Sequence, residues 1–397
     1  MLHFFFLKKY VGSALYRSGR ILCTICILCI GLSCPANAHA TSPPDTIGSP
    51  GTAWIRLSKD GRHFVQGRAG QPFVIWGVNY DRDNGGRLLE DYWLQEWNTV
   101  AEDFGEIKQL GANVVRIHLQ FGKFMRASGQ PDTIALRQLS RLLRLAEKTG
   151  LYLDITGLGN YHKQDVPEWF GKMGEADRWK AQAAFWKAVA GVCAQSPAVF
   201  CYDLMNEPLW PSSKKETEWL AGELAGKYYC QRITLDLGKR APEQVAKTWI
   251  HTLVSAIRTA DSRHLITLGA IPMAQYFPGA GLTFCSPEVA KELDFISVHF
   301  YPDGKDVAGQ IRILKTYDIG KPLLIEEMFP LKCNIDTLNA FVEASRTVAA
   351  GWIGFYWGTR PDEYPKDMAG ALIRSWLAYF RQKAADITGS ANPGSGG

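Results

Sequence analysis

Eight apolar runs, separated by helical patterns, predict an α/β fold that is a (β/α)₈ barrel of the TIM-barrel type. The runs are near-continuous Val, Ile, Leu and Phe segments, which is typical of parallel strands buried on both faces. A doubly wound sheet is the competing fold, and it requires a glycine-rich turn after its first strand. Here the first strand runs into "NYDRDNGG", which lacks that turn, so the sequence favours the barrel.

The first forty residues have the layout of a secretory signal. A basic stretch over 8–20 precedes the apolar run "ILCTICILCIGLSC", and "ANAHA" supplies small residues at positions 36, 38 and 40. We therefore expect export, cleavage after Ala38 or Ala40, and a secreted or periplasmic protein. Two alternatives stay open. One is an uncleaved membrane anchor, although the run is short of the roughly 20 residues that span a bilayer. The other is a lipoprotein attached at Cys34.

Removal of residues 1–40 lowers the formal charge of the chain from +5 to about +1. A nearly neutral protein gives no electrostatic basis for binding nucleic acid or an anionic membrane. We expect a monomer without a cofactor.

Five cysteines lie beyond the signal, and no pair of them has zinc-binding spacing. A disulfide between Cys230 and Cys285 is one pairing that the sequence leaves open.

The remaining elements follow in order along the chain. Residues 41–52 form a linker rich in Pro, Gly, Ser and Thr, and 54–72 form an N-terminal β-hairpin around "KDGR". The catalytic domain is expected to span 53–385, with a disordered tail over 386–397. Strands are predicted at "FVIWGVN", "NVVRIHL", "LYLDIT", "VFCYDLMNEP", "HLITLGA", "DFISVHFYP", "PLLIEEM" and "GWIGFYWG". Helices are predicted near 99–110, 133–148, 175–195, 243–260, 287–292, 305–317 and 335–349, with a last helix that ends near 383. Residues 209–242 form a long insertion after the fourth strand.

Polar residues stand where the predicted strands end, and in a barrel those ends carry the active site. They are Asn79, Arg116, His118, Asn206, Glu207, His299, Tyr301, Glu326, Glu327 and Trp357. Two carboxylates, an arginine, an amide, a histidine and aromatic rings thus converge on one rim. Cleavage of a glycosidic bond needs one acid to protonate the leaving oxygen and one carboxylate to meet the sugar carbon. The strand ends therefore favour a glycosidase.

The motifs "YDLMNEP", "FISVHFYP", "PLLIEEM" and "FYWGT", in this order, resemble glycoside hydrolase family 5, the cellulases and mannanases. "VVRIHL" resembles the second strand of that family, and the resemblance covers about 54–383. It implies a retaining mechanism and a function for each matching residue. Glu207 resembles the acid/base, and Glu327 resembles the nucleophile. Arg116 and Tyr301 resemble the groups that hydrogen-bond the nucleophile, and His299 resembles the histidine near the acid/base. Asn206 resembles the residue that binds the sugar 2-hydroxyl, and Trp357 resembles the platform under the sugar.

The residue chemistry agrees with these roles. A guanidinium near Glu327 is expected to lower its pKa, and Glu207, beside that negative charge, is expected to hold a proton near neutral pH. A retaining enzyme needs the two carboxyl groups about 5–5.5 Å apart. Because side chains alternate along a strand, only one of Glu326 and Glu327 can face the barrel axis.

Other residues carry less specific signals. Thr156 stands where many family members have a histidine, and Met328 replaces the usual aromatic residue after the nucleophile, so the subfamily stays open. His118 has the character of a rim or core histidine, and His162 lies in a loop. Trp169, Trp210 and Tyr276 lie on loops above the strands and are candidates to stack on a sugar, with Trp210 counted among the substrate-binding residues.

The sequence thus predicts a secreted retaining β-glycoside hydrolase. Its expected substrate is a β-1,4-linked polysaccharide or oligosaccharide of the mannan or glucan type, cut at internal bonds. The insertion over 209–242 can wall the groove, which favours short or branched glycans. One alternative is a carbohydrate-binding barrel without turnover, and another is a metal-dependent hydrolase, which requires a His-x-His motif that "GVNYD" lacks. The sugar, the linkage and the oligomeric state are left open.

Overall fold

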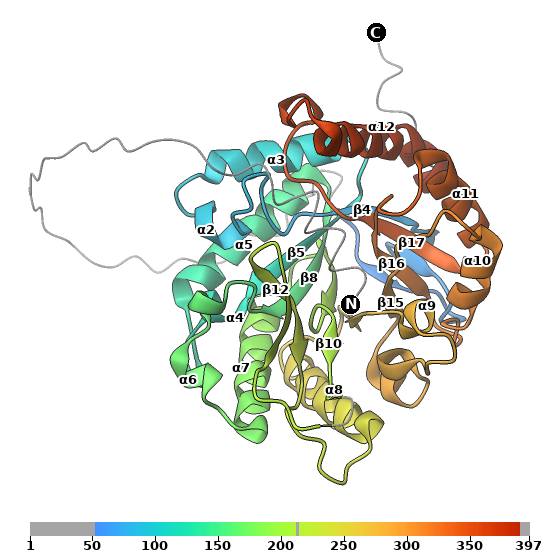
Figure 1. Cartoon of the computed structure of the whole chain (residues 1–397). Helices are drawn as coiled ribbons and strands as arrows, with labels where there is room; N and C mark the ends of the chain where they lie inside the picture. The colour runs from blue at the N-terminus through green and yellow to red at the C-terminus, as the bar shows by residue number, and fades with distance from the viewer. Residues whose placement is uncertain (1–51, 212–213, 390–397) are drawn as a thin grey trace, which may run out of the picture.

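A closed parallel barrel surrounded by helices forms the centre of the molecule (Figure 1). The computed structural model describes residues 52–211 and 214–389. Its central sheet has the order β13-β9-β8-β5-β4-β17-β16-β15-β14. β13 and β14 are parts of one strand interrupted at Leu268, so the two ends of this order adjoin and the sheet closes. The predicted (β/α)₈ barrel is confirmed.

All neighbouring strands of the barrel run parallel, and all of their residues except Ala350 are buried. The strands are β4 (Ile75–Asn79), β5 (Val114–Gln120), β8 (Tyr152–Gly159), β9 (Val199–Asp203), β13 (Leu265–Thr267), β14 (Gly269–Ala270), β15 (Ile296–His299), β16 (Leu323–Met328) and β17 (Ala349–Gly354). The longer helices are α3 (Trp97–Gln109), α5 (Thr133–Thr149), α7 (Glu175–Cys193), α8 (Pro242–Arg258), α10 (Val307–Lys315), α11 (Ile335–Ser345) and α12 (Met368–Thr388). The buried strands have the continuous apolar character that the sequence shows.

Helix boundaries follow local signals in the sequence. Asp132 caps α5, because its side chain accepts hydrogen bonds from the backbone of Ile134 and Ala135. The same helix ends at Gly150, which has a φ of 65°. α12 continues to Thr388, three residues beyond the predicted end of the catalytic domain, and it stacks Phe380 on Trp76 of β4 with ring centroids 4.5 Å apart.

A small antiparallel sheet covers the amino-terminal end of the barrel. It contains β1 (Ile55–Leu57), β2 (Phe64–Gln66) and β3 (Gln71–Pro72), so the expected hairpin has a third short strand. Phe64 of β2 packs edge-on against Phe200 and Phe295, with ring centroids 5.2 and 5.0 Å away. This apolar contact closes the barrel at the end opposite to the strand tips.

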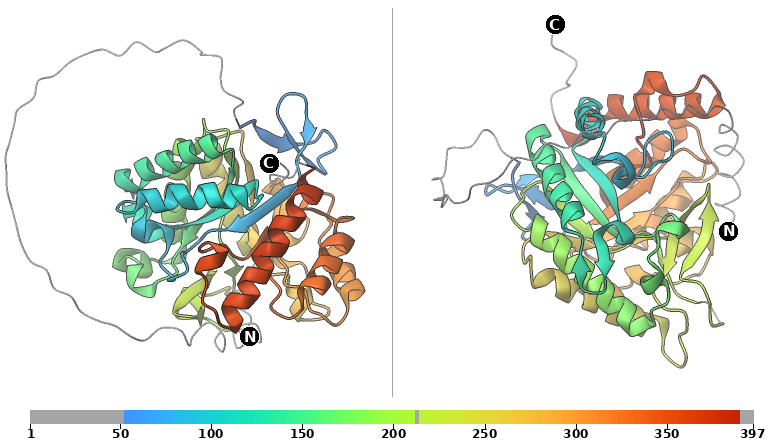
Figure 2. Two further views of the ribbon diagram at one scale, coloured as in Figure 1. Left: turned by 90° about the horizontal axis from the view of Figure 1, so that it is seen from above. Right: turned by 90° about the vertical axis from the view of Figure 1, so that its left-hand side faces the viewer.

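The insertion after β9 forms a second small sheet. β12 (Lys227–Arg232) pairs with β11 (Leu220–Leu224) in antiparallel fashion and with β10 (Pro208–Leu209) in parallel. These strands lie at the end of the molecule away from the β1–β3 sheet (Figure 2). The insertion therefore stands over the carboxyl ends of the barrel strands.

Two predictions about the termini and cysteines have different outcomes. The predicted signal over 1–40 and most of the linker lie outside the described residues. Within the part of the chain that the structure describes, no helix is long and apolar enough to cross a membrane. The pairing of Cys230 with Cys285 is wrong, because both thiols are free and buried.

Barrel closure between β17 and β4 provides a test of the packing. A Cβ atom at Gly351 would lie 2.4 Å from Cβ of Ile75, whose strand is paired with β17. We expect Gly351→Ala to lower the free energy of unfolding by roughly 2–3 kcal/mol, because two paired strands must move apart. Gly191→Ala is the control, since Gly191 lies on the exposed face of α7 and a Cβ atom there would meet no other atom within 4 Å; it should stabilise by about 0.5–1 kcal/mol. Equal urea midpoints for the two variants would contradict this account.

Candidate active site

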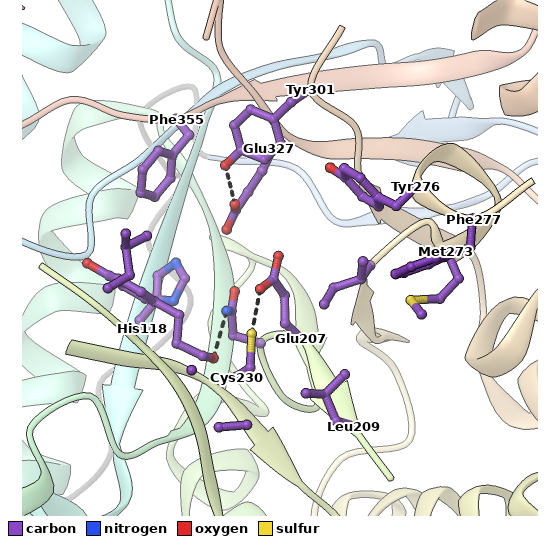
Figure 3. Close-up of a pocket in the computed structure, with 16 residues that line it drawn as sticks. His118, Glu207, Leu209, Cys230, Met273, Tyr276, Phe277, Tyr301, Glu327 and Phe355 are labelled. Carbon is purple, nitrogen blue, oxygen red and sulfur yellow. Dashed lines mark hydrogen bonds between the residues drawn. The ribbon is translucent and has the colours of Figure 1, made fainter. Parts of the chain in front are cut away.

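A cavity of about 390 Å³ opens at the carboxyl ends of the barrel strands (Figure 3). Its walls come from β5 and β16, from the segments after β9, β14, β15 and β17, and from the insertion strands β10, β11 and β12. Four of the predicted site residues line it, namely Asn206, Glu207, Tyr301 and Glu327. The fold therefore brings two glutamates from opposite parts of the sequence to one cavity.

Glu207 and Glu327 face each other across this cavity (Figure 3). Glu327 lies near the end of β16, whereas Glu207 follows β9 and has a φ of 45°. A left-handed backbone is uncommon for a residue with a side chain, and such strain gathers at functional sites. Single oxygen atoms of the two carboxylates lie within 4.8 Å of one another and of a ring nitrogen of His299.

Donors that favour a negative charge surround Glu327. Arg116 donates from Nη1 to its Oε1 at 2.7 Å, and the Tyr301 hydroxyl donates to its Oε2 at 2.6 Å. Burial raises the pKa of Glu327, and the charges of His299 and Arg116 lower it, with a net direction above the usual value. Arg116 lowers the pKa of Glu327 as expected, but burial outweighs the guanidinium and sets the net direction.

His299 and Cys230 hold the carboxylate of Glu207. His299 Nδ1 lies 3.0 Å from Oε1, and the Cys230 thiol donates to Oε2 at 2.9 Å. Burial lowers the pKa of His299, but the charge of Glu327 and the hydrogen bonds to Glu207 and Glu326 raise it to about 10. Burial and the neighbouring Glu207 raise the pKa of Cys230 well above its usual value, so the thiol keeps its proton and acts as a donor.

Arg116 lies beneath the cavity and joins several strands. It donates to Asn79 of β4 at 2.9 Å, to Asp203 of β9 at 2.8 Å and to Asn206 at 3.0 Å, besides its bond to Glu327. Arg116 and His299 are buried and do not line the cavity, which corrects their expected place among the residues that touch substrate. Both contact the carboxylates instead, and Arg116 also holds Asn206.

Glu326 points away from the cavity into the buried region below it. Its Oε2 lies 3.6 Å from Nη2 of Arg116 and 3.3 Å from Nε2 of His299. Burial raises the pKa of Glu326. The charge of Arg116 and the hydrogen bond from His299 lower it by more, so the net pKa is below its usual value. The neighbours Glu326 and Glu327 thus occupy different surroundings, as the alternation of side chains requires.

Two predicted aromatic residues do not border the cavity. Trp357 is 1% exposed and packs against Tyr80, with ring centroids 5.5 Å apart. Trp210 packs against Phe284 at 4.6 Å. Phe355 lines the cavity instead, because β17 ends at Gly354 and the chain beyond it no longer alternates as a strand.

The structure places two of the less specific candidate residues in the cavity lining and two outside it. His118 and Tyr276 line the cavity, whereas Trp169 packs against Phe121 and His162 lies outside the lining. His118 contacts the Tyr161 hydroxyl and lies 3.1 Å from Asn79 Oδ1. Burial and the charge of Arg116 lower the pKa of His118 well below its usual value, so the ring is neutral.

Sequence reasoning missed several residues of the cavity wall. They are Leu209, Ala221, Gly222, Leu224, Tyr229, Cys230, Ile271, Met273, Phe277 and Phe355. Most of them lie in the insertion or in the segment after β14, where no strand end marks a position. The turn between β11 and β12 has φ angles of 50° at Ala225 and 80° at Gly226, and this glycine is the signal in the sequence that could have located the hairpin.

Glu207, His299 and Glu327 also have the donor types of a metal site. A metal-bound imidazole must be neutral, whereas His299 has a pKa of about 10 and is protonated at neutral pH. Arg116 and Tyr301 already donate to both oxygens of Glu327. This donor set suits a proton-transfer site better than a cation site.

The fold and the paired carboxylates define a barrel enzyme of the glycosidase class. The family model of the cellulases, glycosyl hydrolase family 5, matches residues 68–347. The match covers more than half of the chain, so the chain belongs to glycosyl hydrolase family 5.

Its relatives include mannan-degrading enzymes. Mannan endo-1,4-beta-mannosidase A of Podospora anserina is 28% identical over 261 residues, which are 56% of this chain and 60% of that enzyme. Mannan endo-1,4-beta-mannosidase 5 of Solanum lycopersicum is 22% identical over 318 residues, or 72% of this chain and 70% of that enzyme. The chain thus matches less than two thirds of the Podospora enzyme.

Solved structures share the barrel. The exo-beta-1,4-mannosidase of an Opitutaceae bacterium has a TM-score of 0.61 at 19% identity, over 84% of this chain and 63% of that one. The beta-1,4-D-mannanase of Cryptopygus antarcticus has a TM-score of 0.59 at 16% identity, over 87% of this chain and 97% of that one. At such low identity these similarities concern the fold.

Protonation of His299 should link stability to pH. The folded pKa of about 10 exceeds the unfolded value of about 6.5, so the stabilisation is complete below about pH 6.5 and is lost as the pH rises through 10. We expect His299→Gln to lower the free energy of unfolding by roughly 3–5 kcal/mol at pH 6, and by less at pH 10. Urea titrations of both proteins between pH 6 and 10 measure this.

His251→Gln is the matched control, since His251 pairs with Glu292 on the surface at 2.9 Å. Its effect should be small at every pH. A deficit of His299→Gln that stays constant from pH 6 to 10 would show that His299 is not charged in the folded protein.

Proposed function

We propose that this protein is a retaining β-glycoside hydrolase that acts on β-linked mannosides. The observation that supports this most directly is the short distance between Glu207 and Glu327. One carboxylate oxygen of each and one ring nitrogen of His299 all lie within 4.8 Å of one another. Retaining glycosidases separate their carboxyl groups by about 5–5.5 Å, whereas inverting enzymes leave about 6.5–9.5 Å for a water molecule. The names of the relatives favour mannose as the sugar at the cleaved bond.

In the first step of the proposed mechanism, the Glu327 carboxylate attacks the anomeric carbon. The bond from that carbon to the leaving oxygen breaks, and Glu207 gives its proton to this oxygen. Arg116 and Tyr301 hold both oxygens of Glu327, so the nucleophile meets the sugar in a fixed orientation. The products are a glycosyl-enzyme ester and the released aglycone.

In the second step, water replaces the aglycone beside Glu207. Esterification has removed the charge of Glu327, so Glu207 is easier to deprotonate and accepts a proton from the water. The oxygen of that water attacks the anomeric carbon, and the ester bond to Glu327 breaks. Two inversions return the β configuration. His299 is protonated and lies 3.0 Å from Glu207, so it holds the Glu207 carboxyl group in place between the two steps.

The insertion narrows the cavity, so we propose short mannosides as substrates in preference to long internal segments of mannan. Ala221 and Leu224 of β11 and Tyr229 and Cys230 of β12 form one wall. These strands lie over the barrel mouth (Figure 1). We also propose that the chain is exported, on the basis of the signal layout over 1–40.

Replacing each carboxylate should give a different defect. Glu327→Ala should lower kcat/KM for 4-nitrophenyl β-mannoside by about 10⁴-fold or more, because no ester can form. Glu207→Ala should lower kcat/KM for the same substrate by roughly 10²–10⁴-fold. For the dinitrophenyl glycoside, whose leaving group needs little protonation, the same variant should show a much smaller decrease in kcat/KM. Azide should then yield an α-mannosyl azide with Glu327→Ala and a β-mannosyl azide with Glu207→Ala.

Glu288→Ala is the control, because Glu288 pairs with Lys247 on the surface and lies outside the cavity lining. ¹H NMR of the first product should show the β anomer. Full activity of either glutamate variant, or a first product in the α form, would refute the assignment. A carbohydrate-binding barrel without turnover would hydrolyse neither glycoside.

The Cys230 thiol provides a separate test of Glu207. Its hydrogen bond stabilises the charged carboxylate, so Cys230→Ala should move the alkaline limb of the kcat/KM profile to higher pH by roughly 0.5–1 unit. Cys230→Ser keeps a donor and should restore most of the wild-type profile. Cys333→Ala, which removes a free thiol outside the cavity lining, should leave the profile unchanged. An unshifted alkaline limb in Cys230→Ala would show that this contact has no part in the proton balance.

A further inference from the structure

The cavity has two chemically different halves. Leu209, Met273, Tyr276 and Phe277 lie on one side of the two carboxylates, and His118 and Phe355 lie on the other (Figure 3). The first four residues come from the segments after β9 and β14. Both segments border Glu207, whose backbone amide donates to the carbonyl of Gly269 in β14 at 2.9 Å. The apolar half is therefore the half beside the proposed acid/base.

The position of the acid decides which part of the substrate occupies this half. A retaining glycosidase places its acid next to the leaving oxygen, and its nucleophile at the opposite face of the sugar. The aglycone therefore leaves past Glu207, while the sugar that becomes bound to Glu327 lies near Asn206 and His118. The apolar half receives the aglycone.

The side chains of that half are poor partners for sugar hydroxyls. Leu209, Met273 and Phe277 offer no nitrogen or oxygen, and Tyr276 supplies the one hydroxyl of the four. A polar group that loses water without gaining a hydrogen bond destabilises a complex. Two of the four, Leu209 and Met273, also lack the flat ring that stacks on a pyranose. This half suits a hydrocarbon better than a second sugar.

The apolar surface continues out of the cavity. Phe277 is 55% exposed, which is unusual for a ring that also lines a cavity. Met273 and Tyr276 of α9 (Met273–Tyr276) line the same cavity, so one short segment continues from the cavity wall to the surface at Phe277. A chain longer than the cavity can follow this path.

We propose that the natural aglycone is a hydrocarbon chain, so that the substrate is a β-glycoside of an alkyl alcohol such as a glycolipid. This inference rests on the proposed retaining mechanism and adds the class of leaving group. The bond that breaks joins the anomeric carbon to the alkyl oxygen, and Glu207 returns a proton to that oxygen. The released product is a free alcohol.

The experiment compares n-octyl, n-hexyl and methyl β-mannoside with mannobiose and mannotriose as substrates of the full-length enzyme. The alkyl leaving groups have similar acidity, so differences in kcat/KM report contacts with the chain. Each fully buried methylene group strengthens binding roughly fourfold, so burial of about two or three of the seven additional methylenes gives octyl a kcat/KM about 10- to 100-fold above that of methyl. The kcat/KM for octyl mannoside should also exceed the values for mannobiose and mannotriose. An octyl-to-methyl ratio near one, or a preference for mannobiose or mannotriose, would overturn the proposal.

Variants tie the ratio to the apolar half. Met273→Gln and Phe277→Gln should each reduce the octyl-to-methyl ratio by about tenfold, and the exposed position of Phe277 makes that variant safe for folding. Ile134→Gln is the matched control, since Ile134 is an exposed apolar residue of α5, 43% accessible and outside the cavity lining. An unchanged ratio in both cavity variants would place the chain elsewhere and refute the assignment.

The 2,4-dinitrophenyl β-mannoside separates the two proposals. Its leaving group departs with little protonation, so its hydrolysis tests Glu327 and the sugar site. No hydrolysis of this substrate or of the other glycosides would overturn the proposed function and the inference together. Hydrolysis without any preference for longer alkyl chains would overturn the inference alone.

Discussion

The buried guanidinium of Arg116 is the constraint on which the active centre depends. A full charge without solvent is costly unless hydrogen-bonded anions surround it. Arg116 meets that condition through the carboxylates of Asp203 in β9 and Glu327 in β16. It also donates to the neutral amide oxygens of Asn79 in β4 and Asn206 after β9. Strands that are far apart in the sequence must therefore close around one point. Barrel closure and the placement of Glu327 are consequences of the same set of contacts.

Two cations and the protonation of buried acids explain why five carboxyl groups can lie close together at and below the cavity. The carboxyl groups are Asp154, Asp203, Glu207, Glu326 and Glu327, against the cations Arg116 and His299. Burial and the charge of Glu326 raise the pKa of Asp154 well above its usual value, so this acid stays protonated below the cavity. Gly269 completes the arrangement, because a Cβ atom there would lie 2.6 Å from Glu326 and 2.8 Å from His299. The absence of a side chain at Gly269 thus leaves space for the charged cluster.

The fold and the two glutamates could be predicted because local patterns determine them. Continuous apolar runs identify buried parallel strands, and Glu207 and Glu327 stand at the ends of such runs. Trp357 could not be placed in this way, since its position depends on packing against Tyr80 rather than on strand alternation. Cys230 lies in an insertion, and its contact with Glu207 exists only because β12 folds back over the barrel. Contacts between distant segments carry no local signal.

The structure separates the parts that perform chemistry from those that select the substrate. Arg116, His299 and the two glutamates lie on barrel strands or within four residues of their ends, and each is held by several others, so a change in one alters the rest. The apolar wall behind Glu207 lies on short segments outside the barrel strands. Such a wall can change from sugar-binding to hydrocarbon-binding side chains while the carboxylates keep their spacing. The preference for an alkyl leaving group therefore requires no change in the catalytic step, because the same proton goes to an alkyl oxygen as to a sugar oxygen.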